Sequence, residues 1–189
     1  MLEKIMISQS LQEHNAGVGT YGVEATRMRE VAKIAAQFLK LWGYDVRVSP
    51  LAFVALNEPQ DFYSAIRYSN RFGADLHVCL HSNTTPGTIT FFHGGSTDGK
   101  RLATCMQRRI APISPKKDLG VRADTTIYQS GFAELRLTAA TSCLVELFSH
   151  VDRVEVRHFL KNRESYGLAI AWAVCDYYRR VPGMPKLRV

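Results

Sequence analysis

The stretch VEATRMREVAKIAAQFLKLWGYDVRV, residues 23–48, contains the transition that decides the fold class. Apolar residues recur at helical spacing over residues 23–42, which predicts a long amphipathic helix. Gly43 is a typical residue at which such a helix ends. Residues 44–48 then alternate between polar and apolar side chains, as a strand does. A long helix that leads directly into a strand is typical of an α/β chain.

The same alternation of strands and helices continues on both sides of this stretch. The apolar run at residues 5–7 predicts a first strand. The spacing of apolar residues predicts further strands at 75–81, 88–93 and 142–148, with short strand-like pieces at 125–129 and 134–138. It also predicts helices at 60–72, 96–110, 152–162 and 164–180, and residues 113–124 form a basic loop. We therefore expect a single α/β domain over residues 1–180, with a twisted, largely parallel sheet flanked by helices on both faces. Residues 181–189 form a short basic tail.

The composition is that of an ordinary globular protein. Of the 189 residues, 46% are hydrophobic and 22% are charged, which fits one domain. No apolar run is long enough to cross a bilayer, so we expect no stable membrane insertion. The first residues also lack the pattern of a signal peptide. We expect synthesis in the cytoplasm, and release by another agent if the protein acts outside it.

The formal net charge of +7 favours polyanionic partners. Nucleic acid, an anionic cell-wall polymer and a membrane surface all have this property. The basic residues are scattered along the chain and match no nucleic-acid-binding module, so we expect no nucleic-acid partner. An anionic wall polymer and a merely solvated basic surface are the interpretations that stay open.

The four cysteines are far apart in the sequence. Cys79, Cys105, Cys143 and Cys175 form no CxxC pair, so their spacing does not support a cysteine-based zinc site. Disulfides are rare in cytosolic proteins. We expect reduced cysteines, most of them in the core.

Polar side chains follow several of the predicted strands. His14 follows the first strand, His81 ends the strand at 75–81, and Glu146 lies near the end of the strand at 142–148. Glu24 begins the long helix after a glycine-bearing loop. The carboxyl ends of parallel strands are where α/β proteins collect their chemistry. Two histidines and a carboxylate, with a fourth position open, make the skeleton of a catalytic zinc site. A second carboxylate can move a proton from water to a leaving nitrogen.

Structural roles remain open for two of these residues at this point. His14 could be a hydrogen-bonded loop histidine, and Glu24 could be an acid that stabilises a helix N-terminus. Glu146 is more informative, because a carboxylate inside an apolar strand faces a desolvation penalty of several kcal/mol unless it is paired or functional.

The order of His14, Glu24, His81 and Glu146 along the chain resembles that of a known family, the zinc-dependent N-acetylmuramoyl-L-alanine amidases of bacterial cell-wall turnover and phage lysis. The resemblance extends over residues 4–180, and its landmarks are QEHN at 12–15, YGVE at 21–24, ADLHVCLHSN at 74–83 and LVELF at 144–148, with ELR at 134–136 as the short strand before the catalytic glutamate. The chain departs from the family in having no glycine-rich stretch around His14. Phe148 and His150 also stand where the family often has glycine and asparagine.

The resemblance implies one Zn²⁺ per chain, bound by His14, Glu24 and His81, with Glu146 as the catalytic residue. It implies hydrolysis of the amide between N-acetylmuramic acid and L-alanine in peptidoglycan, by a phage or prophage endolysin or a bacterial autolysin that acts on the wall after release. Two alternatives stay open: a zinc hydrolase of another amide, such as a peptidase or deacetylase, and a non-catalytic wall-binding domain.

Four further residues near these landmarks need an interpretation. Asn83 could contact substrate or cap a turn. Arg136 could pair with a substrate carboxylate or form an ordinary salt bridge. His77 and Cys79 share a strand face with His81, and we expect them to pack within the sheet rather than to bind a metal.

Overall fold

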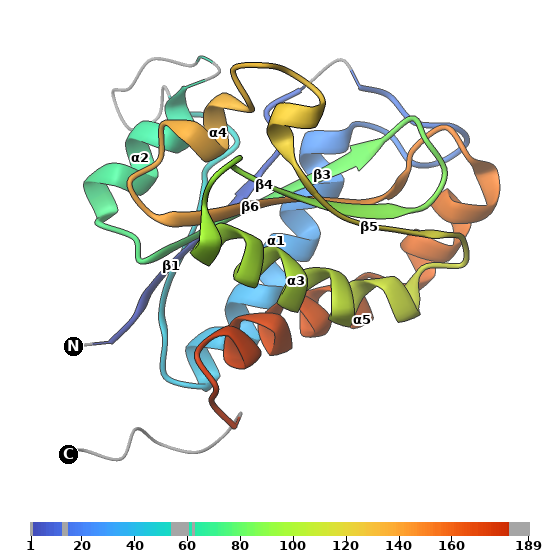
Figure 1. The fold of residues 1–189 in the computed structure, drawn as a ribbon. Helices are drawn as coiled ribbons and strands as arrows, with labels where there is room; N and C mark the ends of the chain where they lie inside the picture. Colours follow the sequence, from blue (N-terminus) through green and yellow to red (C-terminus); the bar gives the residue numbers. More distant parts are fainter. Residues whose placement is uncertain (1, 13–14, 54–60, 62, 182–189) are drawn as a thin grey trace.

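The computed structural model describes residues 2–12, 15–53, 61 and 63–181. Within them lies one six-stranded sheet with the order β2-β1-β3-β6-β4-β5 (Figure 1). The strands are β1 (Lys4–Gln9), β2 (Asp45–Val48), β3 (Leu76–Asn83), β4 (Thr88–Phe92), β5 (Asp118–Ala123) and β6 (Thr141–Ser149). Every neighbouring pair is parallel except β4 and β6, which are antiparallel. The expected α/β domain with a largely parallel sheet is confirmed.

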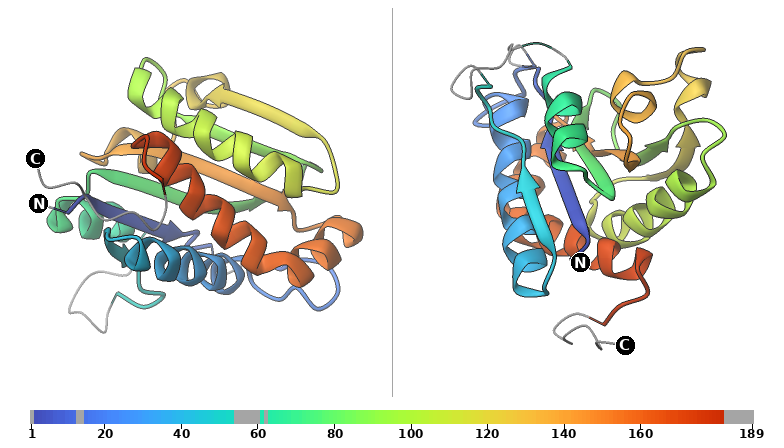
Figure 2. Two further views of the ribbon diagram at one scale, coloured as in Figure 1. Left: turned by 90° about the horizontal axis from the view of Figure 1, so that it is seen from below. Right: turned by 90° about the vertical axis from the view of Figure 1, so that its left-hand side faces the viewer.

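Helices cover both faces of the sheet, as predicted. The helices are α1 (Glu24–Leu41), α2 (Ser64–Phe72), α3 (Thr97–Ile110), α4 (Ala133–Arg136) and α5 (Arg153–Tyr177). The three long helices α1, α5 and α3 lie side by side on one face, with α5 in the middle (Figure 2, left). The two short helices α2 and α4 lie on the opposite face (Figure 1).

The alternation of side chains along β3 divides the interior into two parts. Leu76, Val78 and Leu80 point into the main core beneath the long helices. Cys79 points the other way and belongs to a smaller apolar cluster with Leu135 of α4. Because successive strand residues face opposite sides, His77 and His81 share the face of Cys79. The polar side chains of β3 therefore lie on the side of α4.

Three predicted elements are wrong. Residues 118–123 form the edge strand β5 instead of part of a loop. Its side chains are half-exposed, and the register shifts between Thr88 and Thr90 of its partner, so β5 lacks the clean alternation that marks a strand. The piece expected as a strand at 134–138 is instead the short helix α4, and a 3₁₀ turn, Asp124–Thr126, occupies the start of the piece at 125–129.

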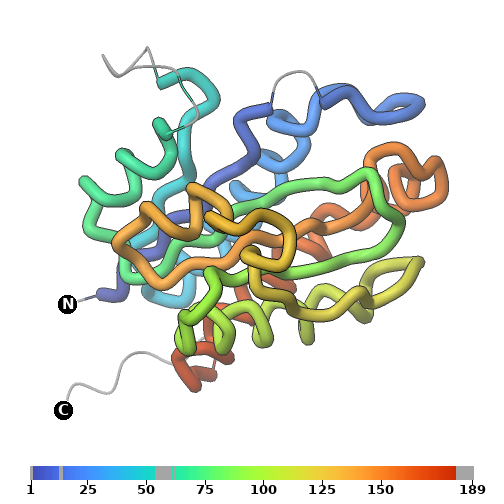
Figure 3. The backbone as a smooth tube through the Cα atoms, turned by 45° about the horizontal axis from the view of Figure 1, so that its top comes forward, coloured from blue at the N-terminus to red at the C-terminus, as the bar shows by residue number. Residues whose placement is uncertain are grey.

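The segment that contains α4 crosses over the sheet rather than joining its edge (Figure 3). The buried carboxylate of Asp124 holds its start, because it accepts hydrogen bonds from the backbone N–H groups of Gly94, at 2.9 Å, and Phe132, at 2.8 Å. These partners are far apart in sequence, so local propensity could not predict the conformation.

Most other boundaries agree closely with the prediction, but the helix predicted at 60–72 begins at Ser64, and residues 60 and 62 lie outside the described part of the chain. The helix predicted at 96–110 is α3, and Ser96 caps it by accepting a hydrogen bond from the Gly99 N–H. The two helices predicted at 152–162 and 164–180 are joined as α5, which is kinked at the predicted break, where Asn162 has φ −118° and ψ 21°. All four cysteines are free, and three of them are buried, as expected.

The basic tail expected at residues 181–189 lies outside the described part of the chain except for Val181. No helix in that part is long and apolar enough to cross a membrane.

Candidate active site

A cleft of about 590 Å³ opens on the α4 face, above the carboxyl-terminal ends of β3 and β6. The parallel register of these strands places His81 directly opposite Glu146. Both side chains line the cleft, and Glu134 of α4 lines it from the other side. The predicted convergence of strand-end residues therefore holds for His81 and Glu146.

Glu24 reaches the same place from the first residue of α1. Its carboxylate is fully buried, and its Oε1 accepts a hydrogen bond of 2.8 Å from the Ser82 N–H. Its Oε2 accepts one of 2.7 Å from the side-chain amide of Asn15. Burial by itself raises the pKa of Glu24, but His81, Asn15 and Ser82 lower it overall. Glu24 is thus an ionised carboxylate with a fixed orientation.

Ser82 is itself held by two aromatic side chains. Its hydroxyl lies 3.0 Å from the Tyr21 hydroxyl and 3.1 Å from His150 Nδ1. The Tyr21 and His150 rings are stacked, with centroids 6.3 Å apart. This buried group supports the backbone N–H that orients Glu24.

His81 lies between two carboxylates. Its Nδ1 is 3.5 Å from Glu24 Oε1, and its Nε2 is 3.0 Å from Glu134 Oε2. Burial lowers the pKa of the His81 imidazole, but Glu134 and Glu24 outweigh burial and raise it well above its ordinary value. Both carboxylates therefore favour the protonated form of the imidazole.

Glu134 is a site residue that the sequence did not reveal. It lies on α4 and is buried. Burial raises the pKa of its carboxyl group, and the hydrogen bond from His81 lowers it overall. The signal in the sequence is an acid between Ala133 and Leu135, but the pattern of residues 134–138 predicts a short strand.

Glu146 differs from the other two carboxylates in having no partner. Its Oε2 is buried and accepts no hydrogen bond from any described residue. Burial raises the pKa of Glu146 to about 7, with His81 opposing this shift and Glu24 and Glu134 adding to it. A buried carboxylate oxygen without a hydrogen-bond partner is expected where a group acts on a ligand or proton.

The remaining predicted residues are placed as follows. His14 lies outside the described residues, although Gln12 lines the cleft and Asn15 contacts Glu24. Asn83 lines the cleft, and its Oδ1 caps a turn by accepting from the Thr84 N–H at 2.7 Å. Arg136 is exposed outside the cleft, and none of the described residues forms an ion pair with it.

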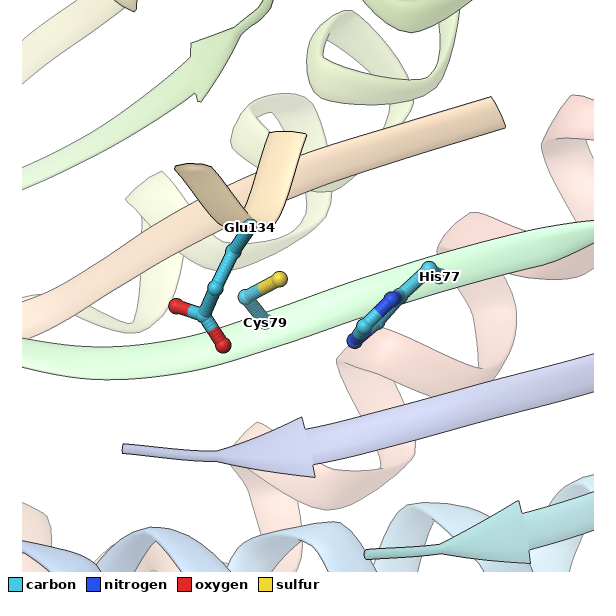
Figure 4. Close-up of side chains that lie close together, drawn as sticks. All are labelled: His77, Cys79 and Glu134. Atoms are coloured by element: carbon cyan, nitrogen blue, oxygen red, sulfur yellow. The ribbon is translucent and has the colours of Figure 1, made fainter. Parts of the chain in front are cut away.

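A second group of possible ligands lies beside the cleft (Figure 4). His77 and Cys79 of β3 and Glu134 of α4 are all buried, and their ligand atoms lie within 4.8 Å of one another, so the cluster could hold a metal ion. Burial lowers the pKa of His77 to about 4, which keeps the ring neutral. His77 and Cys79 are indeed buried in the sheet, as predicted, but they are not isolated from the site.

The family described as N-acetylmuramoyl-L-alanine amidase matches residues 5–176. The chain belongs to this family and is a peptidoglycan amidase. No curated protein sequence matches the chain with significance.

Several solved structures share the fold. The catalytic domain of CwlV, an N-acetylmuramoyl-L-alanine amidase from Bacillus (Paenibacillus) polymyxa var. colistinus, has a TM-score of 0.79 and 17% identity, and the match covers 95% of this chain and 100% of that one. The amidase AmiC2 of Nostoc punctiforme has a TM-score of 0.77 and 18% identity, and the match covers 94% of this chain and 98% of that one. The catalytic domain of CD27L, an endolysin targeting Clostridia difficile, has a TM-score of 0.71 and 22% identity, and the match covers 92% of this chain and 97% of that one.

Proposed function

We propose that this amidase cleaves the bond between N-acetylmuramic acid and L-alanine with one Zn²⁺, held by His14, Glu24 and His81. The observation that carries the proposal is the 3.5 Å separation of Glu24 Oε1 and His81 Nδ1. Zinc bonds of about 2.1 Å at a tetrahedral angle place neighbouring ligands about 3.4 Å apart. The two buried groups therefore fit as ligands of one ion.

His14 completes the proposed ligand set. Its support comes from the chain on either side, where Gln12 lines the cleft and Asn15 holds Glu24. The third ligand and a fourth, open position give the arrangement that is typical of catalytic zinc.

Glu146 is the proton carrier in this proposal. Bound zinc would polarise the amide carbonyl and lower the pKa of water. The unpartnered Oε2 of Glu146 accepts a proton from the attacking water and passes it to the leaving nitrogen. Amide hydrolysis needs this transfer because a free amide anion is too poor a leaving group. Asn83, which lines the cleft, contacts the substrate, and Arg136 interacts with a substrate carboxylate beyond it.

We also propose that the basic surface holds the enzyme on anionic wall polymers. A groove of about 450 Å³ between α1 and β2 is lined by four cationic side chains: Arg29, Lys33, Lys40 and Arg47. Its lining contains no acidic residue among those described. Such a groove suits a polyanion that the enzyme would meet after release from the cytoplasm, as an endolysin or an autolysin.

The test uses purified peptidoglycan and two proteins, wild type and Glu146→Gln, each with chelator and with added zinc. We expect zinc-dependent loss of turbidity with the wild type, and new L-alanine amino termini without new reducing sugar ends. The Glu146→Gln variant should keep its zinc and lose the activity. New amino termini of another residue would instead show a peptidase, and no release despite bound zinc would overturn the proposed substrate bond.

A further inference from the structure

The two ring nitrogens of His81 face carboxylates of different elements. Nδ1 faces Glu24 of α1 at 3.5 Å, and Nε2 faces Glu134 of α4 at 3.0 Å. Glu24 belongs to the proposed ligand set, whereas the family landmarks assign no role to Glu134. The second contact therefore needs its own explanation.

The two distances indicate different kinds of contact. The 3.0 Å between His81 Nε2 and Glu134 Oε2 is an ordinary hydrogen-bond length, so Nε2–H donates to the carboxylate. The 3.5 Å between His81 Nδ1 and Glu24 Oε1 is longer than a strong charged hydrogen bond and close to the separation of two ligands around one ion. Which nitrogen of a histidine binds a metal is set by the hydrogen bond that the other makes.

We propose that Glu134 is a positioning residue, which fixes the Nε2–H tautomer of His81 and so directs its Nδ1 toward the metal. This inference rests on the proposed zinc site. A carboxylate in this place also increases the basicity of the ligating nitrogen and stops rotation of the ring.

The surroundings of Glu134 suit this role because they hold it in place. Asp124 anchors Phe132, the residue that precedes α4, through a hydrogen bond of 2.8 Å to its N–H. On the other side, the Ser142 hydroxyl of β6 donates to the Leu135 carbonyl at 3.2 Å. The carboxylate is buried between these two attachments, so it has little freedom to leave His81.

A separate metal site at His77, Cys79 and Glu134 is the competing interpretation. The His77 ring contacts hydroxyl groups with both nitrogens, Ser8 Oγ at 2.8 Å and Thr138 Oγ1 at 3.3 Å. A metal bound by His77 in this cluster would have to displace the hydroxyl of Ser8 or of Thr138 from the ring. The hydrogen bonds of the His77 ring therefore disfavour a metal at this cluster and favour Glu134 as the residue that positions His81.

The first experiment compares zinc affinity, by competition with a chromogenic chelator, in wild type, Glu134→Ala, Glu134→Gln and the exposed control Glu164→Gln. We expect about 10- to 100-fold weaker binding for Glu134→Ala, in the range seen when such a partner is removed. Glu134→Gln should lose less, because its amide oxygen still accepts from Nε2–H. The control should bind as wild type does. Glu134→Gln also tests the inference if Glu134→Ala fails to fold.

The second measurement is ¹⁵N NMR of the histidine rings in the zinc-loaded proteins. We expect His81 to carry its proton on Nε2 in the wild type, and that proton to exchange faster with solvent in Glu134→Gln. Zinc on Nε2, or unchanged affinity in both variants, would overturn the role of Glu134 while the zinc site stands. Binding of a second zinc that is lost in Cys79→Ser would also overturn the role of Glu134, because it would show a metal site at His77, Cys79 and Glu134. A wild type that binds no zinc would refute the zinc site itself, and the inference with it.

Discussion

His81 and Glu146 are directly paired across the parallel strands β3 and β6, with their side chains in one cleft. The pairing places the imidazole that is held by two carboxylates beside Glu146, whose Oε2 has no hydrogen-bond partner among the described residues. The proposed metal ligand and the proposed proton carrier are thus fixed to the same rigid part of the sheet, where their separation does not depend on a loop.

Replacing Glu146 by Gln should lower kcat by about 10²- to 10⁴-fold, the usual contribution of a general acid or base. The amide keeps the shape of the side chain but cannot accept the proton. The measurement is the initial rate of L-alanine amino-terminus release at saturating substrate. Zinc content should not change, and a variant that retains more than a tenth of wild-type kcat would contradict the assigned role.

The metal-free protein should show a pH-dependent stability that arises from Glu146. Its pKa is raised from 4.5 to about 7 in the folded chain. Between these values the folded state keeps a proton that the unfolded state has lost, so the free energy of unfolding falls as pH rises. Glu146→Gln should abolish this fall in the free energy of unfolding, because the amide does not titrate.

The effect is measured by urea unfolding with chelator present, at about pH 5 and about pH 8. The stability of Glu146→Gln relative to wild type should increase over this interval by at most about 3 kcal/mol, less where solvent screens the exposed part of the side chain. A difference that is constant with pH would show that Glu146 has an ordinary pKa.

Zinc should stabilise the wild type against unfolding, and Glu24→Gln should lose most of that effect. A ligand at about 100 times its Kd adds about 2.7 kcal/mol to the free energy of unfolding. The amide that replaces the Glu24 carboxylate could still accept from the Ser82 N–H but would be a much weaker zinc ligand. Thermal scans with zinc and with chelator measure the difference, and Glu164→Gln serves as the exposed control. An equal zinc-induced shift in wild type and Glu24→Gln would remove Glu24 from the ligand set.

Asp124→Ala should reduce stability and zinc affinity together. The change leaves the Gly94 and Phe132 N–H groups without their carboxylate partner, and each of these partly buried donors costs at most about 1 to 3 kcal/mol. It also frees the chain that positions α4 and Glu134. Chemical denaturation and zinc affinity measure the two effects. Asp98→Ala, which removes an exposed carboxylate from α3, should change neither.

The double substitution Lys33→Glu and Lys40→Glu should weaken binding to anionic wall polymers. Both residues line the basic groove, so the change reverses two of its four positive charges. Co-sedimentation with intact walls at increasing salt measures the binding, and hydrolysis of a small soluble muropeptide should be unaffected. Lys161→Glu on α5 is the control. Wall binding as strong as that of the wild type would place the contact elsewhere.

The sequence by itself determined the fold class and most of the site. Helical spacing over α1, the glycine at position 43 and the alternation in β2 are local patterns, and local patterns define secondary structure. Glu24, His81 and Glu146 could be selected because each is a polar group at an element end or inside an apolar strand. The order of strands and helices then places such ends at one edge of the sheet.

Only the tertiary structure decided the position of Glu134 beside His81 and the course of β5. Glu134 and His81 are 53 positions apart, and the hydrogen bond between them exists because Asp124 and Ser142 hold α4 over the sheet. The half-exposed strand β5 exists because β4 offers it an edge to pair with. Both depend on long-range partners rather than on the intrinsic preference of the segment, so nothing in the local sequence distinguishes them from a loop or a short strand.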